Sequence, residues 1–140
     1  MRLPHDGRAA QLELQWFEKQ ACRLPEALWL SFEPAWATMQ GWRMLKLGEW
    51  IAPLEVVRDG NRRLHAVQAV RHVDERGELQ IDLLDAALVA PGAPSLLNFT
   101  NRQSPRRGGM HVNLSNNVWG TNFPMWYEDD ARFRFVIRLL

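Results

Sequence analysis

The chain has 140 residues, a length typical of a single domain. Apolar residues make up 46% and charged residues 24% of the chain, a composition that excludes disorder for the bulk of it. Seventeen basic and sixteen acidic residues leave a net charge of +1, so the charge balance favours neither a nucleic acid nor a membrane partner, and we expect neither.

The first ten residues contain no apolar stretch after Arg2, and no run approaches the roughly 18 apolar residues of a membrane span. These features predict a cytoplasmic protein without a signal peptide. Cys22 is the only cysteine, so no internal disulfide can form. The four histidines are scattered without metal-ligand spacing, and we therefore expect no metal or other cofactor in this chain.

Apolar and polar residues alternate with a period of two along most of the chain, which is typical of strands with one buried face. The first alternating run, around Leu12, Leu14 and Trp16, also fits a weak helix over 9–21. We favour a strand because Leu14 would fall off the apolar face of that helix. The alternating runs, in chain order, are 12–16, 28–32, 64–73, 79–83, 110–114 and 133–139.

Turn residues separate these runs and predict an antiparallel connectivity. Residues 74–77 form a short polar connection that predicts a hairpin. Residues 98–109 are predicted to form a solvated loop, and the alternative is that its three arginines contact an anion. Further breaks are predicted at Asp59–Gly60 between 54–58 and 62–73, at Pro91–Pro94, and at a polar turn over 128–130. The sequence therefore predicts an all-β chain of at least six strands, folded as an antiparallel β-sandwich.

The seven tryptophans leave two interpretations open: most could pack a core, or two or three could present flat faces to a ligand. Residues 113–126 place two of them among asparagines. An asparagine side chain both donates and accepts hydrogen bonds, which suits sugar hydroxyls, and an indole face suits the apolar face of a pyranose ring. Alternatively, the asparagines bond to the backbone of turns and Trp119 plugs the end of the sandwich. The candidate carbohydrate-proximal residues are Asn116, Asn117, Trp119, Thr121, Asn122 and Trp126.

The order of several motifs resembles the C-terminal β-domain of glycoside hydrolase family 38, the α-mannosidases, and most closely its bacterial relatives. The most specific element is the run Asn116-Asn117-Val118-Trp119-Gly120-Thr121-Asn122-Phe123-Pro124, and weaker matches are Trp16 with Lys19, 23–29, 64–67, 84–86 and 132–135. The resemblance covers roughly residues 11–140 and implies part of a galactose mutarotase-like supersandwich, preceded by a flexible segment at 1–10. In that family a carboxylate nucleophile, a carboxylic acid and a zinc ion lie in an N-terminal α/β domain.

This chain has no counterpart of that α/β domain or of its zinc ligands. The resemblance therefore implies that the chain corresponds to the last part of the family's β-region and is not catalytic by itself. Glu33 and Asp85 are the best single carboxylates, and each is better explained as a loop anchor. We expect a carbohydrate partner, contacted by an Asn/Trp loop, and a partner chain that carries the α/β domain. A stand-alone carbohydrate-binding module and a sandwich fragment without a ligand are the alternatives. Because a partial sandwich leaves strand edges unpaired, we also expect the isolated chain to be poorly soluble or bound to a partner.

Overall fold

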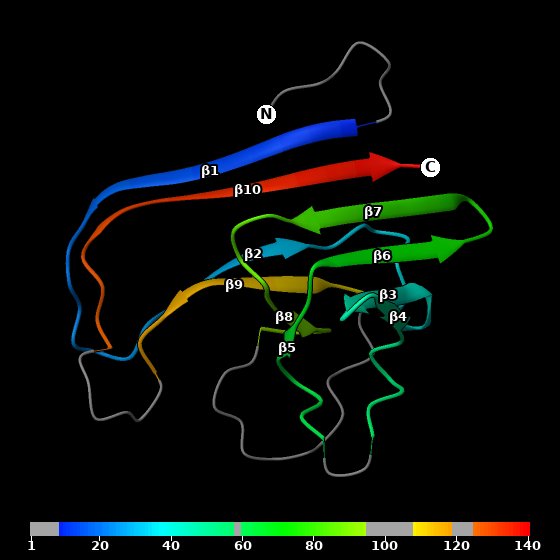
Figure 1. Ribbon diagram of the computed structural model, residues 1–140, viewed down its shortest axis with the longest axis horizontal. Helices are drawn as coiled ribbons and strands as arrows, with labels where there is room; N and C mark the ends of the chain where they lie inside the picture. Colours follow the sequence, from blue (N-terminus) through cyan, green and yellow to red (C-terminus); the bar gives the residue numbers. More distant parts are fainter. Residues whose placement is uncertain (1–8, 58–59, 95–107, 119–124) are drawn as a thin grey trace.

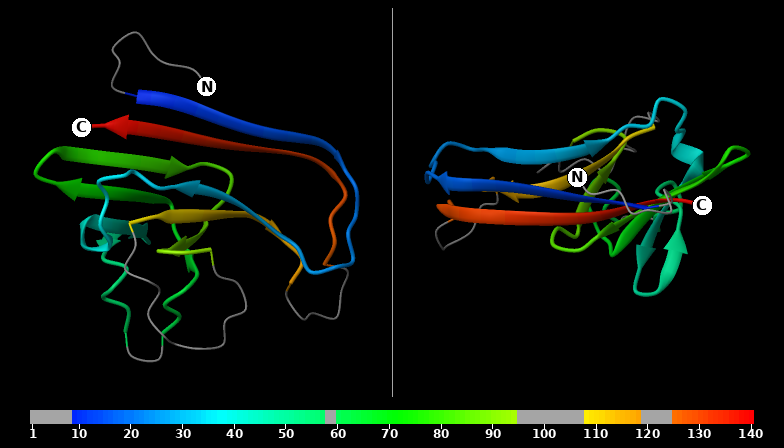
Figure 2. Two further views of the ribbon diagram at one scale, coloured as in Figure 1. Left: turned by 180° about the vertical axis from the view of Figure 1, so that it is seen from behind. Right: turned by 90° about the horizontal axis from the view of Figure 1, so that it is seen from above.

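The computed structural model describes residues 9–57, 60–94, 108–118 and 125–140, and these form ten strands in two antiparallel sheets. The six-stranded sheet has the order β1-β10-β7-β6-β3-β4 and the four-stranded sheet the order β2-β9-β8-β5. Figure 1 shows the first sheet with β1 outermost, and the view from above in Figure 2 shows β2 and β9 as a second layer over β1 and β10. The predicted all-β antiparallel sandwich is therefore confirmed.

The six-stranded sheet contains two long strands and four shorter ones. Its strands are β1 (Ala9–Lys19), β10 (Asp129–Leu139), β7 (Gly77–Leu83), β6 (Ala69–Asp74), β3 (Trp42–Lys46) and β4 (Glu49–Ile51). The four-stranded sheet comprises β2 (Ala27–Phe32), β9 (Met110–Asn116), β8 (Leu88–Pro91) and β5 (His65–Ala66). A short 3-10 helix, η1 (Met39–Gly41), precedes β3.

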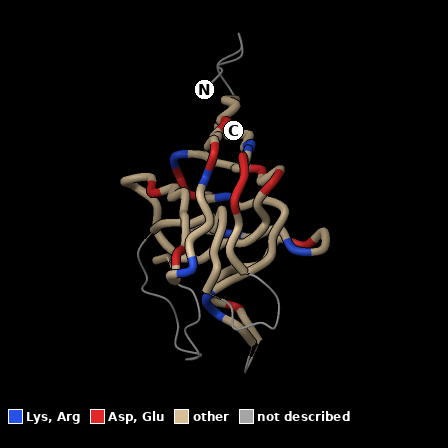
Figure 3. Tube along the Cα trace, turned by 90° about the vertical axis from the view of Figure 1, so that its left-hand side faces the viewer, with Lys and Arg blue, Asp and Glu red and all other residues tan. Residues whose placement is uncertain are grey.

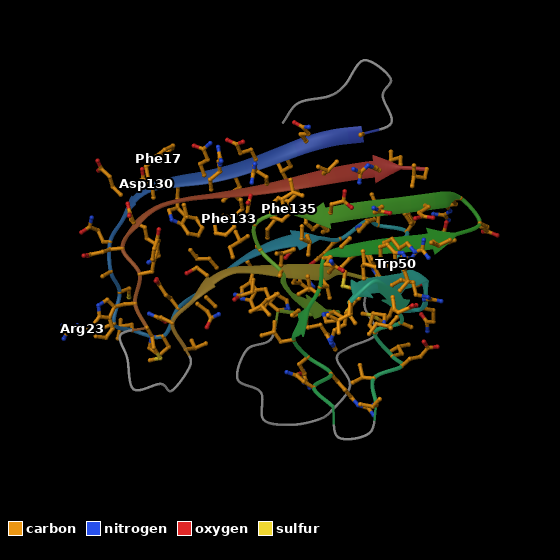
Figure 4. The ribbon with its side chains drawn as sticks, viewed as in Figure 1. Phe17, Arg23, Trp50, Asp130, Phe133 and Phe135 are labelled. Atoms are coloured by element: carbon orange, nitrogen blue, oxygen red, sulfur yellow. The ribbon has the colours of Figure 1, made fainter. Side chains whose placement is uncertain are left out.

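The core lies between the two sheets, where the alternating apolar residues of each strand meet. In the register of β1 with β10, Leu12 opposes Phe135 and Leu14 opposes Phe133 on the inner face. Phe135 also packs edge-on against Phe32 of the other sheet, with ring centroids 5.7 Å apart. Figure 4 shows Phe133 and Phe135 along β10 between the layers. The alternation in 12–16 therefore encodes a strand, as predicted, and not a helix.

A buried histidine lies beside two tryptophans at the other end of the six-stranded sheet. The His72 ring packs edge-on against Trp36 and Trp42, with centroid separations of 4.9 and 5.3 Å. Its Nε2 accepts a hydrogen bond from the Thr38 backbone N–H at 3.0 Å. Burial lowers the pKa of His72, so the imidazole is neutral at pH 7 and packs like an aromatic side chain.

Two local predictions need correction, and two strands were missed. The run 64–73 is not one strand: it divides into β5 and β6, which belong to different sheets, because the chain crosses between the layers at Val67 and Gln68. The polar turn predicted over 128–130 is shorter, since β10 already begins at Asp129. Strands β3 and β4 were not predicted.

The described tryptophans differ in burial. Trp42 is fully buried, and Trp16 and Trp36 pack against the core, whereas Trp126 is 40% exposed. The predicted hairpin over 74–77 is confirmed, with Asp74 opposite Gly77 in the register of β6 with β7. Of the predicted loop over 98–109, residues 98–107 lie outside the described part of the chain.

Candidate functional site

Most of the described candidate residues lie at the end of the sandwich where β1 and β10 bend toward β2 and β9, at the left of Figure 1. Asn116 is the last residue of β9, Asn117 follows it, and Trp126 precedes β10. The connection between β1 and β2, residues 20–26, passes beside them. Trp119, Thr121 and Asn122 lie outside the described residues.

Asn117 is buried, and its amide is fully engaged with the backbone of the β1–β2 connection. Its Nδ2 donates to the carbonyls of Cys22 at 2.7 Å and Leu24 at 2.9 Å, and its Oδ1 accepts from the Glu26 N–H at 2.6 Å. The Asn117 backbone N–H also donates to the Glu26 carbonyl at 3.1 Å. Because both amide donors are satisfied, this side chain holds the two segments together and offers a ligand no further N–H group.

Asn116 has a free acceptor. Its Nδ2 donates to Asn113 Oδ1 at 2.7 Å, while its own buried Oδ1 has no hydrogen-bond partner among the described residues. Asn113 is itself buried, and its Nδ2 lies 3.3 Å from the Ser115 carbonyl and 3.4 Å from that of Leu28. A buried amide oxygen without a partner is costly, and because this atom is shielded from solvent, a buried water is the group best suited to satisfy it.

Trp126 presents an aromatic surface beside basic side chains. The guanidinium carbon of Arg23 lies 4.9 Å from the centroid of the Trp126 ring, a cation–π geometry. Lys19 Nζ lies 2.5 Å from Glu26 Oε1 and 3.5 Å from the Tyr127 carbonyl, which ties the end of β1 to both neighbouring segments. Sequence reasoning did not assign Lys19 and Arg23 to the site, although both lie in the motifs that carry the family resemblance.

The exposed surface at this end is apolar and aromatic as well as basic. Leu24 is 74% exposed, and Trp126 and Tyr127 are 40% and 42% exposed. Figure 3 looks onto this end and shows Lys and Arg positions interspersed with Asp and Glu positions along the described chain. Among the described residues, this surface therefore combines ring faces with charges of both signs and shows no basic stripe of the kind typical of nucleic-acid binding.

A second cluster, not found by sequence reasoning, lies on the four-stranded sheet. Ser31 and His111 are directly opposed in the register of β2 with β9, and Ser31 Oγ lies 2.8 Å from His111 Nδ1. Glu33 Oε1 is 3.6 Å from the same nitrogen. The cleft beside them has a volume of about 540 Å³ and is lined in part by Gly92, Gly108, Glu33 and His111.

This cluster lacks the arrangement of a nucleophilic triad. In such a triad the hydroxyl and the carboxylate bond to opposite nitrogens of the imidazole, whereas here both approach Nδ1. Burial lowers the pKa of His111, and the nearby Glu33 carboxylate opposes that shift. Glu33, one of the two carboxylates singled out in the sequence, therefore contacts a neutral histidine at pH 7.

Asp85, the other singled-out carboxylate, is engaged in an ion pair. Its Oδ2 accepts from Arg134 Nε at 2.9 Å and from the Arg134 backbone N–H at 2.8 Å, and its Oδ1 accepts from Nη2 at 2.8 Å. These bonds lower the pKa of Asp85. A carboxylate held in this way connects the segment after β7 to β10 and is poorly placed to serve as a general acid.

Within the described ranges no three His, Cys, Asp or Glu side chains are placed to hold a metal ion. The same residues include no helix with the length and apolar character needed to cross a bilayer. Comparisons with models of protein families, with curated proteins and with solved structures find no match to this chain.

Proposed function

We propose that this chain is a non-catalytic β-sandwich domain of an α-mannosidase-like glycoside hydrolase, and that its Asn/Trp end faces the carbohydrate. The observation that carries the proposal is the partly exposed Trp126 ring beside Arg23, on the end of the sandwich that also holds the unpartnered Asn116 Oδ1. A ring face suits the apolar face of a sugar, and the Arg23 guanidinium beside it can donate a hydrogen bond to a hydroxyl.

Catalysis is assigned to a partner chain that carries the α/β domain and its zinc ion. This assignment is supported by the ion pair of Asp85 with Arg134 and by the position of Glu33 against the buried His111. Glu33 lines the cleft of about 540 Å³, and Asp85 is not among the residues that line it. Retaining hydrolysis requires two carboxyl groups about 5 Å apart across the glycosidic bond. We therefore expect no turnover of an aryl α-mannoside by the purified chain, with or without added zinc.

The chain offers a matched pair of variants for testing the carbohydrate contact. Trp50 also has an arginine over its ring, with the Arg71 guanidinium carbon 4.3 Å from the centroid, but it lies at the opposite end of the molecule (Figure 4). Methyl α-mannoside binding is measured by NMR titration of the tryptophan indole N–H signals. Trp126→Ala is expected to weaken binding about three- to tenfold, and Trp50→Ala to leave it unchanged.

Equal effects of the two substitutions, or no perturbation of any indole signal at saturating sugar, would contradict the carbohydrate role. In the latter case the sandwich without a ligand becomes the better description. That alternative already has one observation in its favour, since the amide of Asn117 is engaged entirely with the backbone. Binding by the isolated chain without any partner would favour the stand-alone binding module.

A further inference from the structure

The outer edge of β1 is unpaired among the described residues. One side of the strand pairs with β10 from Ala9 to Trp16 and again at Lys19, and no described strand lies against the other side. Figure 1 shows β1 as the outermost strand of the six-stranded sheet. Its outward backbone N–H and C=O groups are therefore available to another extended chain.

This edge also lacks the features that normally prevent edge-to-edge pairing. Proteins protect such edges with lysines, prolines, bulges or short strands. Residues 9–17 contain no lysine and no proline, and Glu13 is their only charged side chain. The irregularity of β1 comes only after Trp16, where Glu18 has a φ of 51°. The edge is thus regular up to the point where the strand bends.

We propose that a second copy of this chain pairs with β1 through its own β1, antiparallel, about a two-fold axis beside Leu14. The two six-stranded sheets then form one continuous sheet. This inference does not depend on the proposed carbohydrate role, because the pairing edge and the Asn/Trp end are different surfaces. The segment paired on each side is 11–17, which ends just before the irregularity at Glu18.

Charge and side-chain pairing favour this register. An axis beside Glu13 would oppose the two Glu13 carboxylates, and directly opposed like charges destabilise a sheet. An axis beside Leu14 places Glu13 of each copy opposite Gln15 of the other. Two such pairs therefore form on the outer face of the sheet. The two side chains are complementary, since within one chain the Gln15 amide already donates to the Glu13 carboxylate.

The inner face of the edge gains cover from the same pairing. Leu12, Leu14 and Trp16 pack against the core but are only partly buried. In the proposed register Leu12 opposes Trp16 of the second copy and Leu14 opposes its own counterpart. Cross-strand pairs of aromatic and aliphatic residues stabilise sheets, so the association adds burial where the edge strand leaves apolar area exposed.

Substitutions at Gln15 change the charge that faces Glu13 of the second copy, and they thereby test the proposed register. Within one chain Gln15 opposes Arg132 of β10, whereas across the proposed dimer it opposes Glu13. We expect Gln15→Glu to raise the dimer dissociation constant about fivefold through two like-charge pairs, and Gln15→Lys to lower it. Within one chain Gln15 lies beside both Arg132 and Glu13, so thermal stability measured at concentrations where the chain is monomeric is the control that separates a loss of dimerisation from a loss of folding.

The dissociation constants come from sedimentation equilibrium of the full chain over a range of concentrations. Cysteine cross-linking then tests the register, in a Cys22→Ser background. Opposed Cα atoms in antiparallel strands lie about 4.5–5.5 Å apart, within disulfide range. An equimolar mixture of Glu13→Cys and Gln15→Cys chains is expected to form an interchain disulfide on mild oxidation, and each variant alone is not.

Two results would overturn the proposal. If the wild-type chain sediments as a monomer at every concentration, β1 does not pair with a second copy. The remaining candidate for pairing with this edge is then a strand of a different chain. Efficient cross-linking of Glu13→Cys alone shows that the axis lies beside Glu13 and that the charge argument for the register is wrong.

Discussion

Asn117→Ala tests whether the Asn/Trp end is held together by the bonds of one side chain. The Asn117 amide makes three hydrogen bonds at 2.6–2.9 Å to the backbone of residues 22–26 and is only 8% exposed. Each bond contributes about 1 kcal/mol net, and a buried backbone group left without a partner costs about 1–3 kcal/mol. Some of the freed groups will be reached by water, so we expect a loss of about 3 kcal/mol in the free energy of unfolding.

For a chain of this size about 3 kcal/mol corresponds to a fall in Tm of about 10 °C. The assay is thermal unfolding followed by circular dichroism, with urea unfolding to obtain the free energy. Asn116→Ala is the control, since its side chain makes one hydrogen bond, to Asn113, and its loss should cost about 1 kcal/mol.

Asn117→Asp gives a second, independent readout of the same geometry. The substitution keeps the shape of the side chain but places a carboxylate oxygen against the carbonyls of Cys22 and Leu24, which now accept bonds from Nδ2. Folding should then raise the pKa of the new carboxyl group, because its protonated form can donate to one carbonyl. The contribution of this group, measured as the difference from wild type, is therefore most favourable below pH about 4 and is lost as the pH rises through the raised pKa.

An Asn117→Ala variant with a Tm within about 2 °C of wild type would refute this reasoning. Such a result would mean that the segment 22–26 is held by other contacts. In that case the Asn117 amide could contact the carbohydrate, as predicted from the sequence, and Asn117→Ala would lower the affinity for sugar directly. If the variant is destabilised as calculated, any loss of sugar affinity must be compared at temperatures where both chains are folded.

Two further predictions concern histidines inside the sandwich. Burial, assisted by the nearby charge of Lys46, lowers the pKa of His65 from 6.5 to about 4. Between these two pH values the unfolded chain binds more protons than the folded chain. The free energy of unfolding should therefore fall by about 3 kcal/mol as the pH drops from 6.5 to 4. Urea unfolding across this range should show the fall, and His65→Gln should flatten it; an unchanged slope in that variant would assign the effect to other groups. A Cβ at Gly41 would lie 2.2 Å from His72 Nε2, so Gly41→Ala should cost about 3 kcal/mol by overpacking. Gly48→Ala is the control, because Gly48 has a φ of +89° and an added Cβ would meet no atom within 4 Å. This substitution should cost about 1 kcal/mol from backbone strain alone. Equal losses of stability in the two variants would exclude a clash at Gly41.

The sequence by itself determined the class of fold, because the period of apolar residues reports directly on which face of a strand is buried. Alternation around Leu12, Leu14 and Trp16 predicted a strand correctly, and the polar residues of 74–77 predicted the hairpin between β6 and β7. Both signals are local: they depend on side-chain direction and on turn chemistry within a few residues.

The same periodicity could not say which sheet a strand joins. Within the run 64–73, Val67, Ala69 and Val73 share one face of the predicted strand, yet the chain crosses from one sheet to the other at Val67 and Gln68. The buried face changes at the crossing: His65 and Val67 are buried before it, whereas in β6 Val70 and His72 are buried and Val73 is 42% exposed. The alternation therefore did not predict which side chains of β6 face the core. The short strands β3 and β4 were missed because five and three residues carry too little periodicity to stand out from a loop.

Only the tertiary structure decided what the polar residues of the candidate site do. Ser31 and His111 lie 80 residues apart and meet through the register of β2 with β9, and the Asn117 amide contacts carbonyls more than 90 residues away. Whether an asparagine faces a ligand or a backbone depends on which chain segment passes beside it. The neighbouring segment is determined by strand pairing over the whole sandwich, so the pattern of residues 113–126 alone could not predict it.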